Sequence, residues 1–124
     1  MAEISERRRI QVSWEAHAVE DAWHFALPLD QLRQGEMIGM QLAGAEVLLV
    51  NLGTDDIHAY DNRCPHVGSL LSKGDLHGAN LRCPSHAWEF DARTGEGISP
   101  RLCTLHRFPV KVVDGNLMVQ VLRR

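Results

Sequence analysis

The 124-residue chain is predicted to fold as a single all-β domain, either an antiparallel sandwich or a barrel. Short strand-like segments recur along it with turn signals between them, which is typical of these two architectures. No long segment keeps the 3.6-residue apolar period of a helix. Apolar residues make up 44% and charged residues 23% of the chain, values close to globular averages, so a packed core is expected.

The strands of the first half are delimited by aromatic residues, turns and one apolar run. An aromatic-rich segment ends at Pro28, and a hairpin predicted at residues 43–45 separates two further strand-like segments. The run at residues 47–50, Val-Leu-Leu-Val, suits a buried strand. These features predict strands at residues 23–27, 37–42, 46–52 and 57–60, with a turn or one helical turn at 29–32 and a turn at 55–56.

Glycines divide the second half of the chain. Turns are predicted at Lys73-Gly74 and His77-Gly78, and a glycine-punctuated turn is predicted at residues 91–97. The pair Asp114-Gly115 favours a type I′ turn and therefore a closing hairpin. The strands predicted here are a short one at residues 87–90 and two longer ones at 108–113 and 116–122.

Charge and hydropathy exclude two classes of partner. The net charge is −3, whereas a nucleic-acid binder needs clustered Lys and Arg residues to neutralise phosphates. No apolar run approaches the roughly 18 residues that a membrane-spanning helix needs. Three arginines at residues 7–9 suggest an export signal, but the segment that follows is too polar for one. A cytoplasmic protein that binds neither nucleic acid nor membranes is therefore expected.

Two Cys/His pairs carry the chemistry. Cys64 and His66 form the first pair, Cys83 and His86 the second, and sixteen residues separate His66 from Cys83. Each pair is expected in a loop between strands, so two loops supply two thiolates and two imidazoles. Thiolates suit zinc or iron–sulfur clusters, and imidazole suits zinc or iron. The set fits a [2Fe–2S] cluster with two Cys on one iron and two His on the other, and leaves open a Cys₂His₂ zinc site.

On these residues the chain resembles the Rieske ferredoxins, over about residues 23–121. Gly68, the segment 70–72 with Gly74, and the segment 94–100, which is similar to the proline loop of the family, support the resemblance. It implies a Rieske-type antiparallel sandwich or barrel with an inserted cluster-binding lobe at about residues 63–90. The implied organisation is an N-terminal tail at residues 1–21 and a Rieske domain at residues 22–124.

The resemblance also implies a ligand set and a function. Cys64 and Cys83 would bind one iron of a single Rieske-type [2Fe–2S] cluster, and His66 and His86 the other. Because it has a tryptophan, Trp88, two residues after His86, the chain is similar to the ferredoxins of multicomponent di-iron monooxygenases that oxidise toluene, alkenes or isoprene. The chain would be an electron-transfer component and not itself an enzyme. It would carry single electrons from an NADH-dependent flavin reductase to the oxygenase hydroxylase, as a monomer that docks transiently through its cluster tip.

Departures from the respiratory Rieske proteins predict a low reduction potential. Those proteins resemble this chain but carry an extra Cys in each loop, joined as a disulfide, where this chain has Ser69 and Ser85. They also place hydroxyl groups two and four residues after the second His, which favour the reduced cluster. This chain has Trp88 and Phe90 there, so those hydrogen bonds are missing. A potential low in the Rieske range is expected.

Two other functions remain open, and several residues have simpler interpretations. The alternatives are the ferredoxin of an aromatic-ring-hydroxylating dioxygenase and a zinc-stabilised module without redox activity. Cys103 is predicted to be a buried thiol, and Trp88 is predicted to pack beneath the cluster loop. Surface or hydrogen-bonded framework positions are predicted for the remaining histidines, which are His17, His24, His58, His77 and His106.

Overall fold

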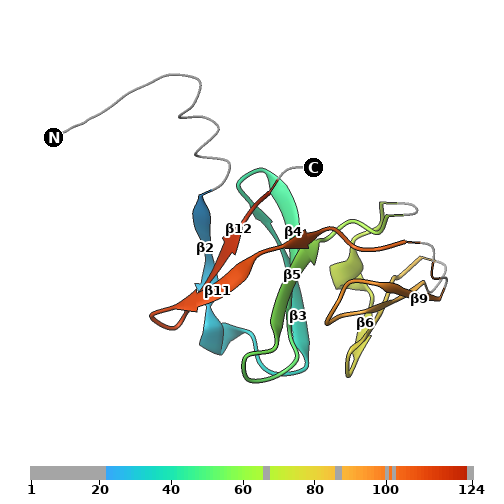
Figure 1. Cartoon of the computed structure of the whole chain (residues 1–124), viewed down its shortest axis with the longest axis horizontal. Coiled ribbons are helices and arrows are strands. Elements are labelled where there is room, and N and C mark those ends of the chain that lie inside the picture. The colour runs from blue at the N-terminus through green and yellow to red at the C-terminus, as the bar shows by residue number, and fades with distance from the viewer. Residues whose placement is uncertain (1–21, 66–67, 86–87, 100, 102, 123–124) are drawn as a thin grey trace, which may run out of the picture.

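The part of the chain that the structure describes forms three antiparallel sheets (Figure 1). The computed structural model describes residues 22–65, 68–85, 88–99, 101 and 103–122. Two sheets form a base. One has the spatial order β10 (Arg107–Phe108), β5 (Ile57–Asp61), β4 (Ala45–Asn51) and β3 (Glu36–Leu42), and the other the order β11 (Val110–Val113), β12 (Asn116–Gln120) and β2 (Trp23–Pro28).

The third sheet forms a separate lobe at the end of the molecule away from β2 (Figure 1). Its order is β6 (Asp75–His77), β7 (Asn80–Arg82), β8 (Glu89–Asp91) and β9 (Gly97–Ser99). Two single turns of 3-10 helix complete the described elements, η1 (Leu29–Gln31) after β2 and η2 (Leu71–Lys73) before β6. The predicted all-β antiparallel fold is confirmed. Within the described ranges no helix has the length and apolarity that crossing a membrane would require.

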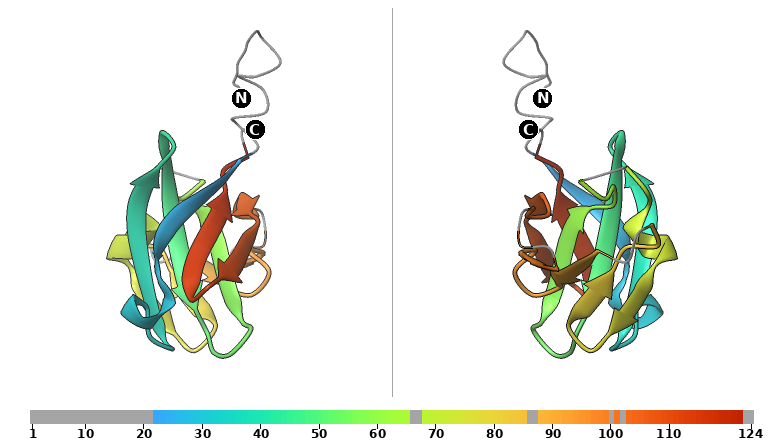
Figure 2. Two further views of the ribbon diagram at one scale, coloured as in Figure 1. Left: turned by 90° about the vertical axis from the view of Figure 1, so that its left-hand side faces the viewer. Right: turned by 90° about the vertical axis from the view of Figure 1, so that its right-hand side faces the viewer.

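Strand β4 lies at the centre of the fold and has both faces covered. Val47 and Leu49 point into the core between the two base sheets, which stand as two layers in Figure 2. Leu48 and Val50 point the other way, into a second core shared with the lobe. All four side chains are fully buried. Because successive side chains of a strand alternate between faces, the unbroken apolar run is what a strand between two cores requires.

We call the second core the lobe core. It consists of buried residues from β4 and β5, from the lobe strands and from the loops between them. Its members are Leu48, Val50, Tyr60, Cys64, Leu71, Leu81, Cys83, Phe90, Ala92 and Leu105.

The two tight hairpins of the base contain residues in the left-handed region. The φ angles are 51° at Ala43 and 81° at Gly44, and 52° at Asp114 and 79° at Gly115. Positive φ at both central residues is the type I′ pattern, whose twist matches that of the flanking strands. The turn predicted at residues 114–115 is confirmed, and the predicted 43–45 turn is narrowed to residues 43–44.

Two predicted strands differ from the structure. The segment predicted as one strand at residues 108–113 is divided between sheets: Phe108 pairs with Ala59 of β5, and Val110 pairs with Val119 of β12. Pro109 lies at the division, where its missing N–H group cannot interrupt a ladder. In place of the strand predicted at residues 87–90, the structure describes β8, which begins at Glu89 and ends at Asp91. The sequence analysis also missed β9, since it assigned this segment to a loop.

Candidate metal centre

The first candidate ligand, Cys64, lies in a loop that closes on itself after β5. The backbone N–H of Cys64 donates to the Ser69 carbonyl at 2.7 Å, and the N–H of Gly68 donates to the Cys64 carbonyl at 2.8 Å. Gly68 has a φ of +77°, in the region where a side chain is strained, so glycine suits this closure. The thiol of Cys64 is held inward, and the residue is 1% exposed.

The second candidate ligand, Cys83, lies in the loop between β7 and β8. Its backbone N–H donates to the Trp88 carbonyl at 2.7 Å. Below it the two strands pair through Arg82 and Glu89, whose side chains form an ion pair at 2.8 Å. The Arg82 hydrogen bond, aided by one from Asn80, holds the pKa of the Glu89 carboxyl below its usual value. Cys83 is also 1% exposed.

The two loops are tied to one another. The hydroxyl oxygens of Ser69 and Ser85 lie 2.6 Å apart, within hydrogen-bonding distance. Gly74, at the end of η2, packs so closely on the second loop that a Cβ there would overlap the carbonyl oxygen of Arg82. The two loops thus bring Cys64 and Cys83 into one lobe core. The other two predicted ligands, His66 and His86, lie outside the described residues.

Asn62 is a structural residue of the site that sequence reasoning missed. It is 1% exposed, two residues before Cys64. Its side-chain oxygen accepts from the Ser72 N–H at 2.9 Å, and its amide donates to the Ser72 hydroxyl at 3.0 Å. A Cβ at Gly39 of β3 would overlap both side chains. A lone glycine within a strand signals such close approach, and this was the available clue.

Cys64 and Cys83 fit the end of a Rieske cluster where two thiolates would hold one of the two irons. Both thiols lie in an apolar core, which water does not reach. Two ferric ions, two sulfides, two thiolates and neutral histidines sum to zero charge, so an apolar setting does not penalise the oxidised state. Backbone N–H groups of the loops are the donors that tune such a centre. When bound, the group supplies a one-electron carrier.

Three further predictions concern residues near the loops. Trp88 is half-buried and packs against the lobe core, which confirms a packing role. Phe90 is fully buried in that core and carries no hydroxyl group. The prediction that Cys103 is buried is wrong, because this residue is half-buried. It packs against the lobe core from the irregular segment beside β9, where its carbonyl accepts from the Gly97 N–H at 2.8 Å.

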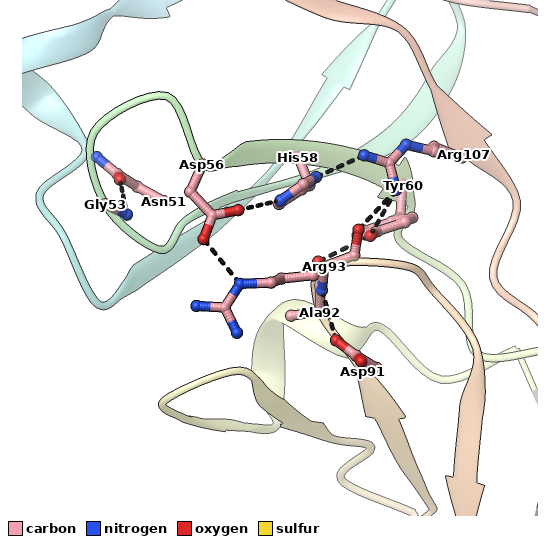
Figure 3. A network of polar contacts seen from close by, with 9 residues as sticks. All are labelled: Asn51, Gly53, Asp56, His58, Tyr60, Asp91, Ala92, Arg93 and Arg107. Atoms are coloured by element: carbon pink, nitrogen blue, oxygen red, sulfur yellow. Dashed lines mark hydrogen bonds and ion pairs between the residues drawn. The ribbon is translucent and has the colours of Figure 1, made fainter.

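Tyr60 joins the base to the lobe (Figure 3). Its ring is fully buried, and its hydroxyl donates to the Ala92 carbonyl, just after β8, at 2.7 Å. Arg107 of β10 donates to the same hydroxyl at 3.3 Å and to the Arg93 carbonyl at 2.8 Å. These bonds satisfy polar groups that would otherwise be buried without partners. They fix the lobe at the point where β8 ends.

A second set of contacts continues this connection to the surface (Figure 3). Arg107 lies 2.6 Å from Nδ1 of His58, and a guanidinium only donates, so this nitrogen accepts. The other ring nitrogen, Nε2, therefore carries the proton and donates to Asp56 at 2.6 Å. Asp56 also pairs with Arg93 of the lobe at 2.9 Å. The His58 and Arg93 hydrogen bonds hold the pKa of the Asp56 carboxyl below its usual value.

Two of the other histidines have the simple roles predicted for them. His58 is a hydrogen-bonded framework residue, and His106 lies with its Nε2 3.1 Å from the Leu122 carbonyl. His77 is exposed and His24 is half-buried. His17 lies outside the described residues.

Burial raises the pKa of Tyr60 to about 12, and this predicts a loss of stability in alkali. The folded chain holds the neutral phenol, whereas the unfolded chain ionises it near pH 10. The stabilisation is therefore complete below about pH 10 and is lost as the pH rises towards 12, by up to about 1.4 kcal/mol per pH unit. Tyr60 is the only tyrosine, so phenolate absorbance reports on it alone.

The folded chain at pH 11 should show only about a tenth of the phenolate absorbance of the unfolded chain's plateau. Tyr60→Phe should remove this absorbance. It should also make the free energy of unfolding less dependent on pH between about pH 10 and 12. A phenolate midpoint near pH 10 in the folded chain would contradict the buried hydrogen bond to Ala92.

Comparisons with known proteins agree with this geometry. The family model for the Rieske [2Fe-2S] domain matches residues 22–109. The ferredoxin component of an alkene monooxygenase system from Xanthobacter autotrophicus is 38% identical over 92 residues, which is 73% of this chain and 75% of the relative. The ferredoxin component of naphthalene 1,2-dioxygenase/salicylate 5-hydroxylase systems from a Ralstonia species is 31% identical over 100 residues, which is 80% of this chain and 95% of the relative.

A solved structure shares the fold. It is a complex of reduced oxygenase and oxidised ferredoxin in carbazole 1,9a-dioxygenase, and the matching chain is 26% identical with a TM-score of 0.76. The match covers 84% of this chain and 97% of that chain. Together with the two buried cysteines on tied loops, the family match over most of the chain leads to one conclusion. The chain belongs to the Rieske [2Fe-2S] domain family.

Proposed function

We propose that the chain carries single electrons from an NADH-dependent flavin reductase to the hydroxylase of a multicomponent aromatic or alkene monooxygenase. The observation that supports this most strongly is the pair of buried cysteines on two mutually tied loops. The alkene monooxygenase ferredoxin has the higher identity of the two relatives, at 38%. The chain is an electron-transfer component and not itself an enzyme.

The proposed ligand set divides the four predicted residues between two irons. Cys64 and Cys83 hold the iron that faces the lobe core, and His66 and His86 hold the other. The loops that carry them belong to a cluster-binding lobe at about residues 63–90, within a Rieske domain at residues 22–124 that follows an N-terminal tail at residues 1–21. The protein's part in the reaction is to exclude water from the thiolates and to hold both loops rigid. The loops and the surrounding solvent then rearrange little when an electron is transferred.

Docking to both partners would use the tip of this lobe. Pro65 and Pro84 are exposed, and each adjoins a buried cysteine, so apolar groups flank the ligands at the surface. A small contact area suits a carrier that must bind and leave two partners in turn. We propose that the carrier works as a monomer in the cytoplasm. The proposed contact residues are Pro65, His66, Val67, Pro84, Ser85, His86 and Pro100.

Phe90→Tyr is expected to raise the reduction potential of the cluster. Phe90 lies in the lobe core with both cysteines, and we expect a hydroxyl at this position to donate to a cysteine sulfur. Such a bond favours the reduced form, which carries one more negative charge. The midpoint in a redox titration measures the change. Phe25→Tyr, on the exposed outer side of β2 and 53% exposed, is the control and should leave the midpoint unchanged. An unshifted midpoint with an intact cluster in Phe90→Tyr would contradict the proposed position of the sulfurs.

The function itself is tested by electron delivery. The reduced protein is mixed under anaerobic conditions with isolated hydroxylases of alkene or aromatic monooxygenases and of naphthalene-type dioxygenases. Faster oxidation by a monooxygenase hydroxylase is the expected result. Preference for a dioxygenase would support the second candidate, which the naphthalene dioxygenase relative favours. Zinc in place of iron and acid-labile sulfide would identify a module without redox activity.

A further inference from the structure

We infer that Ser69 and Ser85 are positioning residues, whose hydrogen bond sets the separation of the two cysteine-bearing loops. This inference rests on the proposed cluster site, since its meaning depends on Cys64 and Cys83 holding a common group. The two hydroxyl oxygens are 2.6 Å apart although the residues are sixteen positions apart in sequence. An O–H···O distance at this short end marks a well-formed hydrogen bond.

Each serine is closely coupled to one cysteine. The Ser69 carbonyl accepts from the Cys64 N–H at 2.7 Å, so a shift of Ser69 moves the backbone of Cys64. Ser85 follows Cys83 by two residues, inside the turn that the bond between the Cys83 N–H and the Trp88 carbonyl closes. The serine pair thus connects the backbones of both cysteines through a short path of hydrogen bonds.

The tie complements a second contact between the loops, at Gly74. There the end of η2 packs on the backbone of Arg82 and comes within van der Waals reach of Pro84. That contact strongly resists approach of the loops but resists their separation only weakly, because dispersion attraction between a few atoms is small. The serine hydrogen bond adds a stronger, directional attraction. Both side chains are half-buried, so water competes only partly for the hydroxyl groups.

The tie is neutral and contains no thiol. A one-electron change at a neighbouring group leaves a hydroxyl pair chemically unchanged. A carrier that cycles between two oxidation states therefore keeps the same loop separation in both. We expect loss of the serine pair to weaken retention of the cluster and to make its geometry less uniform. The stability of the base sheets should change less.

The experiment measures the rate at which a chelator bleaches the visible absorbance of the as-purified protein. Ser69→Ala and Ser85→Ala should each accelerate bleaching by about fivefold, the effect of one ordinary hydrogen bond. The double variant should bleach no faster than either single variant, because both changes remove the same bond. Ser69→Thr, which keeps the hydroxyl, should restore a rate within about twofold of the parent.

A second readout separates positioning from general stabilisation. The EPR line of the reduced cluster should broaden in Ser69→Ala, since looser loops allow a spread of geometries, while the far-UV circular dichroism spectrum stays unchanged. Ser99→Ala removes an exposed serine hydroxyl from the same lobe and should change neither readout.

The outcomes distinguish this inference from the proposed function. A parent protein without iron and acid-labile sulfide would overturn the cluster site and the inference with it. A parent that holds the cluster, together with serine variants whose bleaching rates and EPR lines match the parent's, would overturn the inference alone. Strictly additive effects of the two substitutions would also overturn it, since they would mean that the hydroxyls act independently.

Discussion

Cys83→Ala is expected to abolish cluster binding. Removing one thiolate would leave one iron of the proposed cluster with a single protein sulfur, and the remaining cysteine, Cys103, lies outside both loops. Iron and acid-labile sulfide, each expected at two per chain for a [2Fe-2S] centre, should fall to background, and the visible absorbance should disappear. Cys64→Ala should behave in the same way, because its thiol is equally buried. Metal analysis and absorbance spectra measure both effects.

Cys103 provides the matched control for these substitutions. It is the third cysteine of the chain and packs against the same core, but it is half-buried and lies outside both loops. Cys103→Ala should retain full iron and sulfide content. Loss of the cluster in Cys103→Ala, or its retention in Cys83→Ala, would mean that the thiolates are assigned incorrectly.

Gly74→Ala is expected to have the next largest effect. The added methyl group would overlap the carbonyl oxygen of Arg82 and would lie 3.1 Å from Cδ of Pro84. These atoms belong to backbone and ring, so they cannot move aside as a flexible side chain would. Overpacking of this kind costs about 1–3 kcal/mol or more. We expect the free energy of unfolding to fall by about 3 kcal/mol and cluster loss to accelerate, as measured by denaturant unfolding and by bleaching.

Gly78→Asn tests whether the effect is specific to the packing at Gly74. Gly78 lies in the same lobe with a φ of +58°, and a Cβ there meets nothing within 4 Å. Asn tolerates this left-handed conformation better than most residues. It should therefore change the unfolding free energy by less than about 1 kcal/mol. Equal destabilisation by both substitutions would indicate a general sensitivity of the lobe to glycine replacement and would contradict close packing at Gly74.

Local sequence signals were sufficient to predict most of the base. The run at residues 47–50 predicted a buried strand, and β4 is buried on both faces because each face meets a different core. Asp114-Gly115 predicted a type I′ turn, and both residues have positive φ. These predictions succeeded because a strand's alternation and a two-residue turn depend on neighbours in sequence. The assignment of Cys64 and Cys83 as ligands came from their pairing with His66 and His86 and from the family resemblance, and it stays a prediction.

Contacts between distant segments could not be predicted in this way. The division of residues 108–113 between two sheets depends on which strands lie beside Phe108 and Val110, which the local pattern does not encode. Asn62 resembles an ordinary turn residue until Ser72 is placed against it. The bond between Ser69 and Ser85 joins side chains whose proximity arises only when both loops pack on the lobe core. The parts of the site that the sequence analysis missed are therefore the hydrogen bonds between residues far apart in the sequence, at Asn62 and between Ser69 and Ser85.

An EPR-monitored redox titration of the purified protein tests the central claim most directly. The proposed ligand set of two thiolates and two imidazoles predicts a rhombic Rieske signal. The absence of a hydroxyl at the buried Phe90 predicts that this signal appears only at low potential. The midpoint should lie near the lower end of the range of about −150 to +300 mV that Rieske centres span. The same signal at the upper end would contradict the argument from Phe90. Protein that retains its metal and gives no signal when reduced would contradict the cluster assignment itself.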